Sequence, residues 1–363
     1  MNKSKKIWLN FVLKPVIAIA LAVITCMFFN FLLVTPPQSS TISTTMADAK
    51  AQEENIDIVF LGTSMTFRGI DAVTLSQNLN KNVFNIAYEN ADYYTSYYLL
   101  KEVTKTNNLE KLFLESSIHS FSRTNSTEDI EVYKSLSKDL RDDFAKGIGL
   151  NYIDFPLLEF TNYLKKFSNE RFVKTVTSKL DKKQELGANI SNKHSIYKGH
   201  GFVCNLKQVS SPANLILPKN YFYHNKIFDE SNVDKKQLEY YHKIFELCEE
   251  KNIEVVLYSP TYVQSVVKEY KDDFKNFNRY IADIASVYDV TYLDLTKLKH
   301  KHFAQADEYF YNANHFNAKG AKAMAEVLQS IYQELENGTY NASYWFNERH
   351  YIKGKLYEYY HST

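Results

Sequence analysis

Cysteine, glycine and proline are scarce in this chain of 363 residues, and its charges nearly cancel. The three cysteines, Cys26, Cys204 and Cys248, are too few and too scattered for a disulfide framework or a zinc finger. The 10 glycines and 7 prolines exclude collagen-like and low-complexity chains. The balance of 43 basic and 42 acidic residues gives no reason to expect binding to nucleic acid. The 28 tyrosines and 24 phenylalanines indicate a folded, globular protein.

One long apolar run stands near the N-terminus. Residues 16–34 carry no charge and are about as long as a helix must be to cross the hydrocarbon core. Lys3, Lys5 and Lys6 precede the run, so the bias in basic residues places the N-terminus in the cytoplasm. A cleaved signal peptide is the alternative, but its apolar core is normally shorter, about 7–15 residues. We therefore expect an uncleaved, single-pass membrane anchor in residues 1–34 and an extracellular domain after it.

Apolar segments alternate with amphipathic ones over most of the remaining chain, which predicts strands alternating with helices. Strands are predicted at 56–61, 82–86, 111–115, 253–258 and 290–293. Helices are predicted at 72–79, 97–103, 236–251, 274–288 and 318–335. Such alternation implies right-handed crossovers, so it indicates an α/β fold: a three-layer sandwich around a central, mostly parallel sheet.

Several segments outside this alternation complete the predicted organisation. Residues 35–55 are rich in Pro, Ser, Thr and Ala, which suits a linker between membrane and domain. The domain spans 56–336 and contains an insertion at about 122–232. Within the insertion we predict two helical pieces and one irregular segment, at 129–146, 157–180 and 198–205. Residues 337–363 form an aromatic-rich tail that could bind sugars, although packing on the domain is the expected arrangement.

The residues that could carry chemistry follow predicted strands, because the functional crevice of an open α/β sheet lies outside the carboxyl ends of its strands. Ser64 stands where the first strand turns into a helix, so its Oγ could point into this crevice. A serine nucleophile needs a base, and a third group must orient that base. His315, before the last helix, and Asn312 could supply these. If each residue is considered alone, a simpler interpretation is available. Ser64 would cap a helix, and His315 would be a polar residue near the start of the last helix.

Taken together, these segments resemble the SGNH, or GDSL-type, hydrolase superfamily, particularly its membrane-anchored bacterial members that act on cell-surface glycans. Gly62-Thr63-Ser64 is similar to the first sequence block of the superfamily, and Asn85–Lys101 to the second. Tyr311–Gly320 resembles the last block, whose pattern is Asp-x-x-His followed by a helix. The resemblance covers about 55–125 and 232–335, and it implies a flavodoxin-like arrangement of the central sheet.

Four features depart from the superfamily pattern, and the first is Thr63, which stands where the superfamily usually has Asp or Ser. Asn312 stands where the Asp is expected, and its oxygen can accept the imidazole N–H but cannot offset a positive charge. Papain-type proteases work with Asn in this role, whereas Asp→Asn in a serine-protease triad costs roughly 10⁴-fold in rate. Asn90 aligns with the second-block Gly, which donates an N–H to the oxyanion hole. The third-block Asn has no clear equivalent, although Ser117 or His119 could substitute.

Other residues near strand ends are weaker candidates. Arg68 could meet an anionic substrate or pair with Asp71, and His119 and Tyr262 could contact substrate. Asp294 and Asp307 could each approach His315 in place of the missing Asp, although a surface or capping role is the simpler one for both. The structure has to decide among these alternatives.

The sequence thus predicts a serine esterase or O-acyltransferase that acts on an acyl ester of a cell-envelope polysaccharide or polymer. Ser64 would attack, His315 would accept its proton, Asn312 would orient the imidazole, and the N–H groups of Ser64 and Asn90 would hold the oxyanion. No metal or organic cofactor is required, and an integral-membrane acyl donor is a possible partner. The alternative is a catalytically inactive SGNH-fold subunit that binds or scaffolds an envelope-polymer assembly.

Overall fold

The computed structural model describes residues 12–21, 24–25, 40–122, 129–148, 173, 186–188, 190–207, 215–217, 228–347, 350–352 and 355–357. The chain divides into two compact units, one of Met1–Pro37 with Ala145–Glu185 and one of Gln38–Phe144 with Leu186–Thr363. Residues 12–21, 24 and 25 of the first unit are helical. The rest of the predicted anchor lies outside the described residues. Among the residues that are described, no helix combines the length and the apolar character needed to span a membrane.

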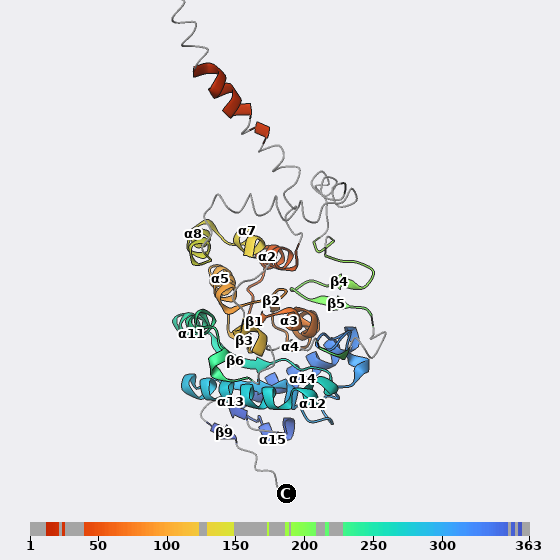
Figure 1. The fold of residues 1–363 in the computed structure, drawn as a ribbon. Coiled ribbons are helices and arrows are strands. Elements are labelled where there is room, and N and C mark those ends of the chain that lie inside the picture. The colour runs from red at the N-terminus through yellow and green to blue at the C-terminus, as the bar shows by residue number, and fades with distance from the viewer. Residues whose placement is uncertain are drawn as a thin grey trace, which may run out of the picture. The chain divides into compact units, whose positions relative to one another are not determined.

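Five parallel strands form the central sheet of the second unit, in the order β2-β1-β3-β6-β7 (Figure 1). They are β1 (Ile58–Gly62), β2 (Val83–Ala87), β3 (Lys111–Glu115), β6 (Glu254–Ser259) and β7 (Thr291–Asp294). Apart from Glu254, every strand residue is buried, as expected when helices cover both faces of a parallel sheet. The predicted α/β class is therefore confirmed.

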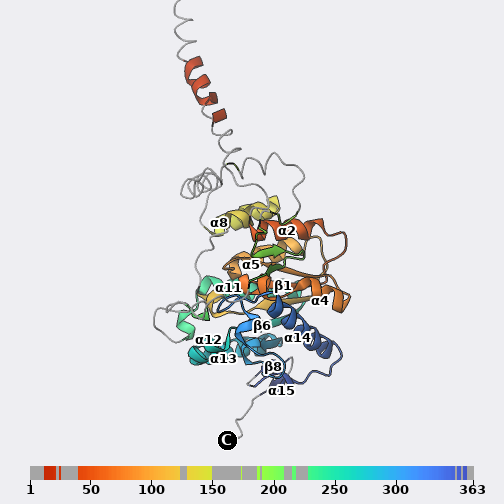
Figure 2. The same cartoon turned by 90° about the vertical axis from the view of Figure 1, so that its right-hand side faces the viewer.

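Helices cover the sheet on both faces. They are α4 (Ala72–Leu79), α5 (Tyr93–Val103), α11 (Lys235–Glu250), α13 (Lys271–Tyr288) and α14 (Ala318–Glu336). Helix α4 packs on α14 and α5 packs on α11, and these pairs lie on opposite sides of the sheet in Figure 2. The stacked rings of Phe245 and Tyr288 join α11 to α13. Such layering follows because the crossover from β1 to β2 runs in one direction along the sheet and the later crossovers run in the other. Right-handed crossovers in opposite directions place their helices on opposite faces of the sheet.

The ends of these helices are set by local sequence. Asp71, Asp92, Asp234 and Asn317 each accept a hydrogen bond from a backbone N–H in the first turn of the helix that follows. Strand β1 lies between β2 and β3, so the direction of chain progression reverses at the carboxyl end of β1. Open α/β sheets place their ligand sites at such a switch point.

Shorter elements follow the strands and close the domain. They are α3 (Ser64–Gly69), α6 (Ile118–Phe121), α12 (Gln264–Glu269), η3 (Leu295–Lys297), η4 (Asp307–Tyr309), α15 (Ala342–Trp345), β8 (His350–Ile352) and β9 (Lys355–Tyr357). The beginning of the aromatic tail packs on the domain: Phe346 is fully buried and bridges Leu298, and the indole N–H of Trp345 donates to Glu334 at 2.7 Å.

Residues 41–51 form helix α2 (Thr41–Ala51), which corrects the prediction of a linker over 35–55. Ser40 and Ser43 form a capping box at its start. Ile42, Met46 and Ala49 are buried, and the helix packs on β2 and on α7 (Asp129–Ser135). The prediction was wrong because the abundant Ser and Thr concealed apolar residues spaced four and three apart, which is helical periodicity.

The insertion between β3 and β6 contains two helices, a hairpin and a short 3₁₀ turn in its described part. These elements are α7, α8 (Lys138–Gly147), β4 (Ser195–Tyr197), β5 (Val203–Asn205) and η2 (Glu230–Asn232). The predicted helix 129–146 is therefore two helices, and the predicted irregular segment 198–205 is a hairpin turn and strand. The predicted helix 157–180 lies outside the described residues, except for Val173.

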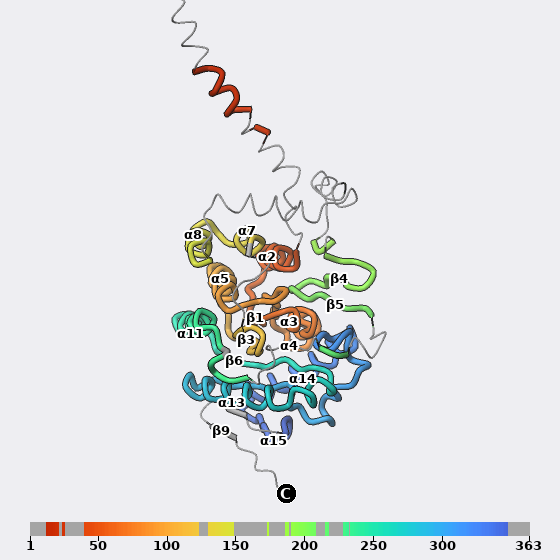
Figure 3. The backbone as a smooth tube through the Cα atoms, viewed as in Figure 1, coloured from red at the N-terminus to blue at the C-terminus, as the bar shows by residue number. Residues whose placement is uncertain are grey.

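The β4–β5 hairpin lies beside the edge strand β2 and near α3 (Figure 3). The Asn85 N–H of β2 donates to the carbonyl of His200 in the hairpin turn at 2.9 Å. The next residue, Gly201, has a φ of 71°, and a Cβ there would stand 2.0 Å from the carbonyl oxygen of Asn85. Only glycine therefore permits the turn to approach the sheet this closely.

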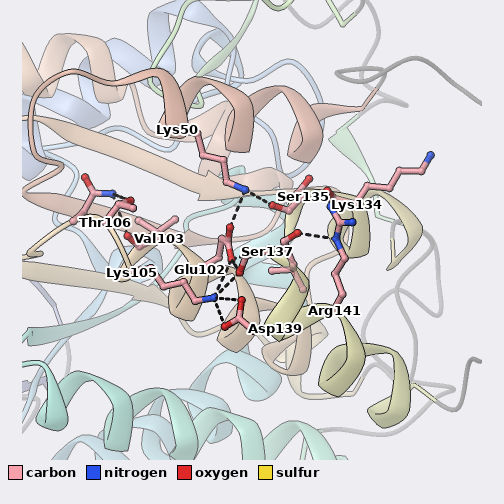
Figure 4. Close-up of polar contacts among 12 residues, drawn as sticks. Lys50, Glu102, Val103, Lys105, Thr106, Lys134, Ser135, Ser137, Asp139 and Arg141 are labelled. Atoms are coloured by element: carbon pink, nitrogen blue, oxygen red, sulfur yellow. Dashed lines mark hydrogen bonds and ion pairs between the residues drawn. The ribbon is translucent and has the colours of Figure 1, made fainter. Parts of the chain in front are cut away.

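A buried carboxylate ties α2 and the insertion to the sheet (Figure 4). Glu102 of α5 pairs with Lys50 of α2 at 2.8 Å and accepts hydrogen bonds from the Ser137 N–H and hydroxyl at 2.9 and 2.6 Å. Lys105 pairs with Asp139 of α8 at 2.5 Å. Burial alone would raise the pKa of Glu102, but the hydrogen bonds from Lys50 and Ser137 outweigh it and lower the pKa.

Replacing Glu102 by Gln should lower the free energy of unfolding by about 1–3 kcal/mol at pH 7, because hydrogen bonds to a charged group are lost. The pKa of Glu102 is depressed in the folded state, so its contribution is complete above the unfolded carboxyl pKa of 4.5 and is lost as the pH falls through the lower folded value. Urea unfolding at pH 7 and below pH 4 measures both effects. The exposed Glu249→Gln is the control, and equal stability of Glu102→Gln and wild type at pH 7 would contradict the network's importance.

Candidate active site

Ser64 lies at the switch point, as the first residue of the helix that follows β1. Thr63 caps this helix, and its hydroxyl accepts the Met65 N–H at 3.2 Å. Ser64 itself is 7% exposed. Within the described part of the chain, the Ser64 backbone N–H has no hydrogen-bond acceptor. The turn therefore offers a hydroxyl and a backbone donor side by side.

Glu115, the last residue of β3, holds this turn in place through hydrogen bonds. Its carboxylate accepts the Thr63 N–H at 2.8 Å, the Thr63 hydroxyl at 2.8 Å and the Thr66 hydroxyl at 2.5 Å. The side chain is fully buried, and burial raises the pKa of Glu115. A Cβ on Gly62 would stand 2.5 Å from the same carboxylate, so this close approach requires glycine. Glu115 was not among the predicted site residues, although a carboxylate that ends an apolar strand is a detectable signal.

His315 is presented by a short loop before α14. The loop closes through a bridge between Phe310 and Phe316, and the Tyr311 N–H donates to the His315 carbonyl at 2.7 Å. Asn317 caps α14 and donates from its amide to the carbonyl of Glu308 at 2.8 Å. A Cβ on Gly320 would meet the Tyr309 carbonyl oxygen at 2.1 Å, so the loop can lie against α14 only because residue 320 is glycine.

The structure brings Ser64, His315 and Asn312 together. His315 Nε2 lies 2.7 Å from Ser64 Oγ, and His315 Nδ1 lies 3.0 Å from Asn312 Oδ1. Asn312 Oδ1 also accepts the backbone N–H groups of Asn314 and His315 at 3.2 and 2.9 Å. Only the amide oxygen can accept these bonds, so Nδ1 carries the hydrogen and Nε2 is free to accept the Ser64 proton. Asn312 thus selects the tautomer that a general base needs.

Charged groups next to His315 come from α3 and from the loop after β2. Arg68 pairs with Glu89 at 2.8 Å and donates to Asn205 of β5 at 2.9 Å. Burial, which is the largest cause, and the positive charge of Arg68 together lower the pKa of His315 to about 4, while the negative charge of Glu89 opposes them. The alternative pairing of Arg68 with Asp71 is not seen, because Asp71 caps α4 and Arg68 pairs with Glu89.

The remaining predicted residues have varied surroundings. Asn90 has a φ of 60°, a left-handed conformation that glycine and asparagine adopt more readily than other residues. His119 lies half-buried in α6. Tyr262 is 2% exposed and packs against Phe274, and its contact with substrate stays a prediction. Asp294 bonds to Asn278 and to Thr296 rather than to the imidazole, and it caps η3.

The alternative acid Asp307 is the first residue of η4, outside the loop that carries His315. Among the described residues, no group of three or more His, Cys, Asp or Glu side chains is arranged to hold a metal ion. The contacts of Ser64 with a neutral imidazole can support proton transfer coupled to nucleophilic attack.

Fold and site together define a doubly wound α/β protein with a Ser-His-Asn arrangement at its switch point. A family model described as "Protein of unknown function (DUF1574)" matches residues 39–329, and the chain belongs to this family. No curated protein matches the chain.

Two solved structures from Bacteroides species are similar to this chain over much of their length. One is a Bacteroides fragilis protein provisionally described as an acylhydrolase, with 9% identity and a TM-score of 0.38, covering 82% of this chain and 95% of that one. The other is a GDSL-like lipase from Bacteroides thetaiotaomicron, with 8% identity and a TM-score of 0.39, covering 82% and 99%.

The imidazole of His315 should titrate near pH 4, well below the usual histidine value of 6.5, because it is buried beside Arg68. NMR of protein labelled with ¹³C in its histidine rings measures the midpoint, and His315→Gln assigns the signal. Circular dichroism at each pH verifies that the protein is folded. A midpoint near 6.5 would contradict the buried environment.

Proposed function

We propose that this protein is a serine-dependent esterase or O-acyltransferase of the SGNH type. The observation that supports the proposal is the 2.7 Å contact between Ser64 Oγ and His315 Nε2, which joins residues 251 positions apart in the sequence. Asn312 on the far side of the imidazole adds the orienting group that such a pair needs.

In this proposal, Ser64 Oγ attacks the acyl carbonyl while His315 Nε2 takes the hydroxyl proton. The oxyanion that forms accepts hydrogen bonds from the backbone N–H groups of Ser64 and Asn90. The imidazolium then protonates the leaving alcohol, and the acyl group remains on Ser64. Water or a second hydroxyl reverses these steps, which gives hydrolysis or transfer respectively. The scheme needs no metal or organic cofactor.

We further propose that the substrate is an acylated cell-envelope polysaccharide or polymer and that residues 1–34 anchor the protein in the cell membrane. The uncharged run at 16–34 and the lysines before it support this proposal. An integral-membrane protein that supplies the acyl group is the partner that best suits an anchored transferase.

A second candidate function is a non-catalytic subunit that binds or scaffolds an envelope-polymer assembly. Asn312 favours it, because an amide cannot offset the positive charge that develops on His315 during catalysis. The tautomer that Asn312 imposes favours catalysis, because an asparagine that donated to the imidazole would leave no acceptor for the Ser64 proton.

The full-length protein in mild detergent should react with a serine-directed fluorophosphonate. Ser64→Ala should abolish labelling, and His315→Ala should slow it by about 10²-fold or more because the general base is lost. Asn312→Ala should label at an intermediate rate, since the imidazole remains but is no longer oriented. Ser122→Ala is the control, because Ser122 is another serine close to a strand end and stands directly after α6. A folded wild type that is not labelled would favour the scaffold.

If residues 1–34 anchor the protein in the membrane, residues before and after the anchor should differ in their accessibility to a reagent outside the cell. In intact cells, a membrane-impermeant maleimide should label Glu53→Cys, an exposed position after α2, but should label Lys3→Cys only after lysis. The native Cys204 and Cys248 are buried and should react slowly. Labelling of Lys3→Cys in intact cells, or recovery of the protein without membranes, would contradict the proposed topology.

A further inference from the structure

One buried side chain from the insertion touches both segments that carry the Ser-His pair. Asn205, at the end of β5, is 1% exposed. Its amide N–H donates to the carbonyl of Phe316, the residue after His315, at 3.0 Å. Its amide oxygen accepts from Arg68 Nη1 at 2.9 Å and from the Ser195 hydroxyl at 3.0 Å. Arg68 lies four residues after Ser64, on the same helix.

The hairpin that carries Asn205 is itself fixed to the sheet. Val203 packs with Phe67 of α3 and Ala87 of β2 in a buried cluster. The Tyr197 hydroxyl donates to Asp48 of α2 at 2.5 Å, and the His200 carbonyl accepts from β2. Asn205 therefore holds Arg68 and the loop of His315 against a rigid support, because its own backbone cannot move without breaking these contacts.

We propose that Asn205 is a positioning residue of the candidate active site, which sets the distance between Ser64 and His315 by joining the nucleophile helix to the histidine loop. This assignment rests on the proposed function for its catalytic consequence. It also gives the insertion a purpose: the segment between β3 and β6 supplies part of the framework of the site. A displacement of about 1 Å between reacting groups is enough to slow a reaction by about 10²-fold.

The same contacts predict an electrostatic consequence. Asn205 and Glu89 hold the two halves of the Arg68 guanidinium, so the positive charge stays beside His315. Without Asn205, Arg68 loses one of its two anchors and the histidine loop loses a side-chain contact. Both changes expose the imidazole to water and favour its protonated form.

Asn205→Ala tests the proposal in the full-length protein, with Ser195→Ala as the matched control. The control removes a hydrogen bond to the same oxygen but leaves Arg68 and Phe316 held. We expect Asn205→Ala to slow fluorophosphonate labelling by about tenfold to a hundredfold and to move the His315 titration midpoint upward. Ser195→Ala should leave the rate within about twofold and the midpoint unchanged.

A folded Asn205→Ala protein with wild-type rate and wild-type midpoint would overturn the proposal. If this variant does not fold, Asn205→Asp replaces it, because it keeps an acceptor for Arg68 while it loses the donor to Phe316 and adds a negative charge that pairs with Arg68. Its labelling rate should still fall, and an unchanged rate would also overturn the proposal. The labelling rate tests the proposed catalysis, and an unlabelled wild type would reject it. The His315 titration midpoint measured by NMR tests separately whether Asn205 controls the surroundings of the imidazole.

Discussion

The buried carboxylate of Glu115 is the contact on which the candidate site depends. Burying a carboxylate is costly unless its oxygens are hydrogen-bonded, and here the donors come from the turn that carries Ser64. The parallel pairing of β1 with β3 brings the two strand ends level, and the absence of a side chain on Gly62 lets them approach. A requirement of folding, to satisfy Glu115, thus also fixes the orientation of the nucleophile helix.

The rest of the site is assembled by long-range contacts onto this turn. The loop of His315 is held by α14 on one side and by Asn205 on the other. Within the loop, two backbone N–H groups orient Asn312 without any charge. The arrangement therefore combines a neutral orienting group with an imidazole that burial keeps neutral, and in the described part of the chain the charges that act on this imidazole are those of the paired Arg68 and Glu89.

Local patterns explain which features the sequence could predict. The five strands are mostly apolar, and four of the five helices that cover the sheet begin at Asp or Asn caps, so both are visible in short windows. Ser64, Asn312 and His315 were predicted to lie together because each follows a strand or precedes a helix at one end of the sheet. Helix α2 was missed because its composition resembles a linker.

Contacts between distant residues explain the failures. The hydrogen bond from Thr63 to Glu115 joins residues 52 positions apart, and the bonds of Asn205 with Arg68 and Phe316 join residues 137 and 111 positions apart. A local sequence pattern cannot predict such pairs. The pairing of Arg68 with Glu89 rather than Asp71 depends on where the loop after β2 lies.

The hairpin of the insertion also affects how this protein behaves among other chains. An edge strand with unpaired N–H groups is a template for pairing with a neighbour, and many aggregates grow in this way. In β2, the N–H of Val83 is taken by the Ser76 hydroxyl at 3.0 Å and that of Asn85 by the His200 carbonyl. The sheet is thereby blocked from growing at this edge, so a second copy of the chain cannot add a strand beside β2.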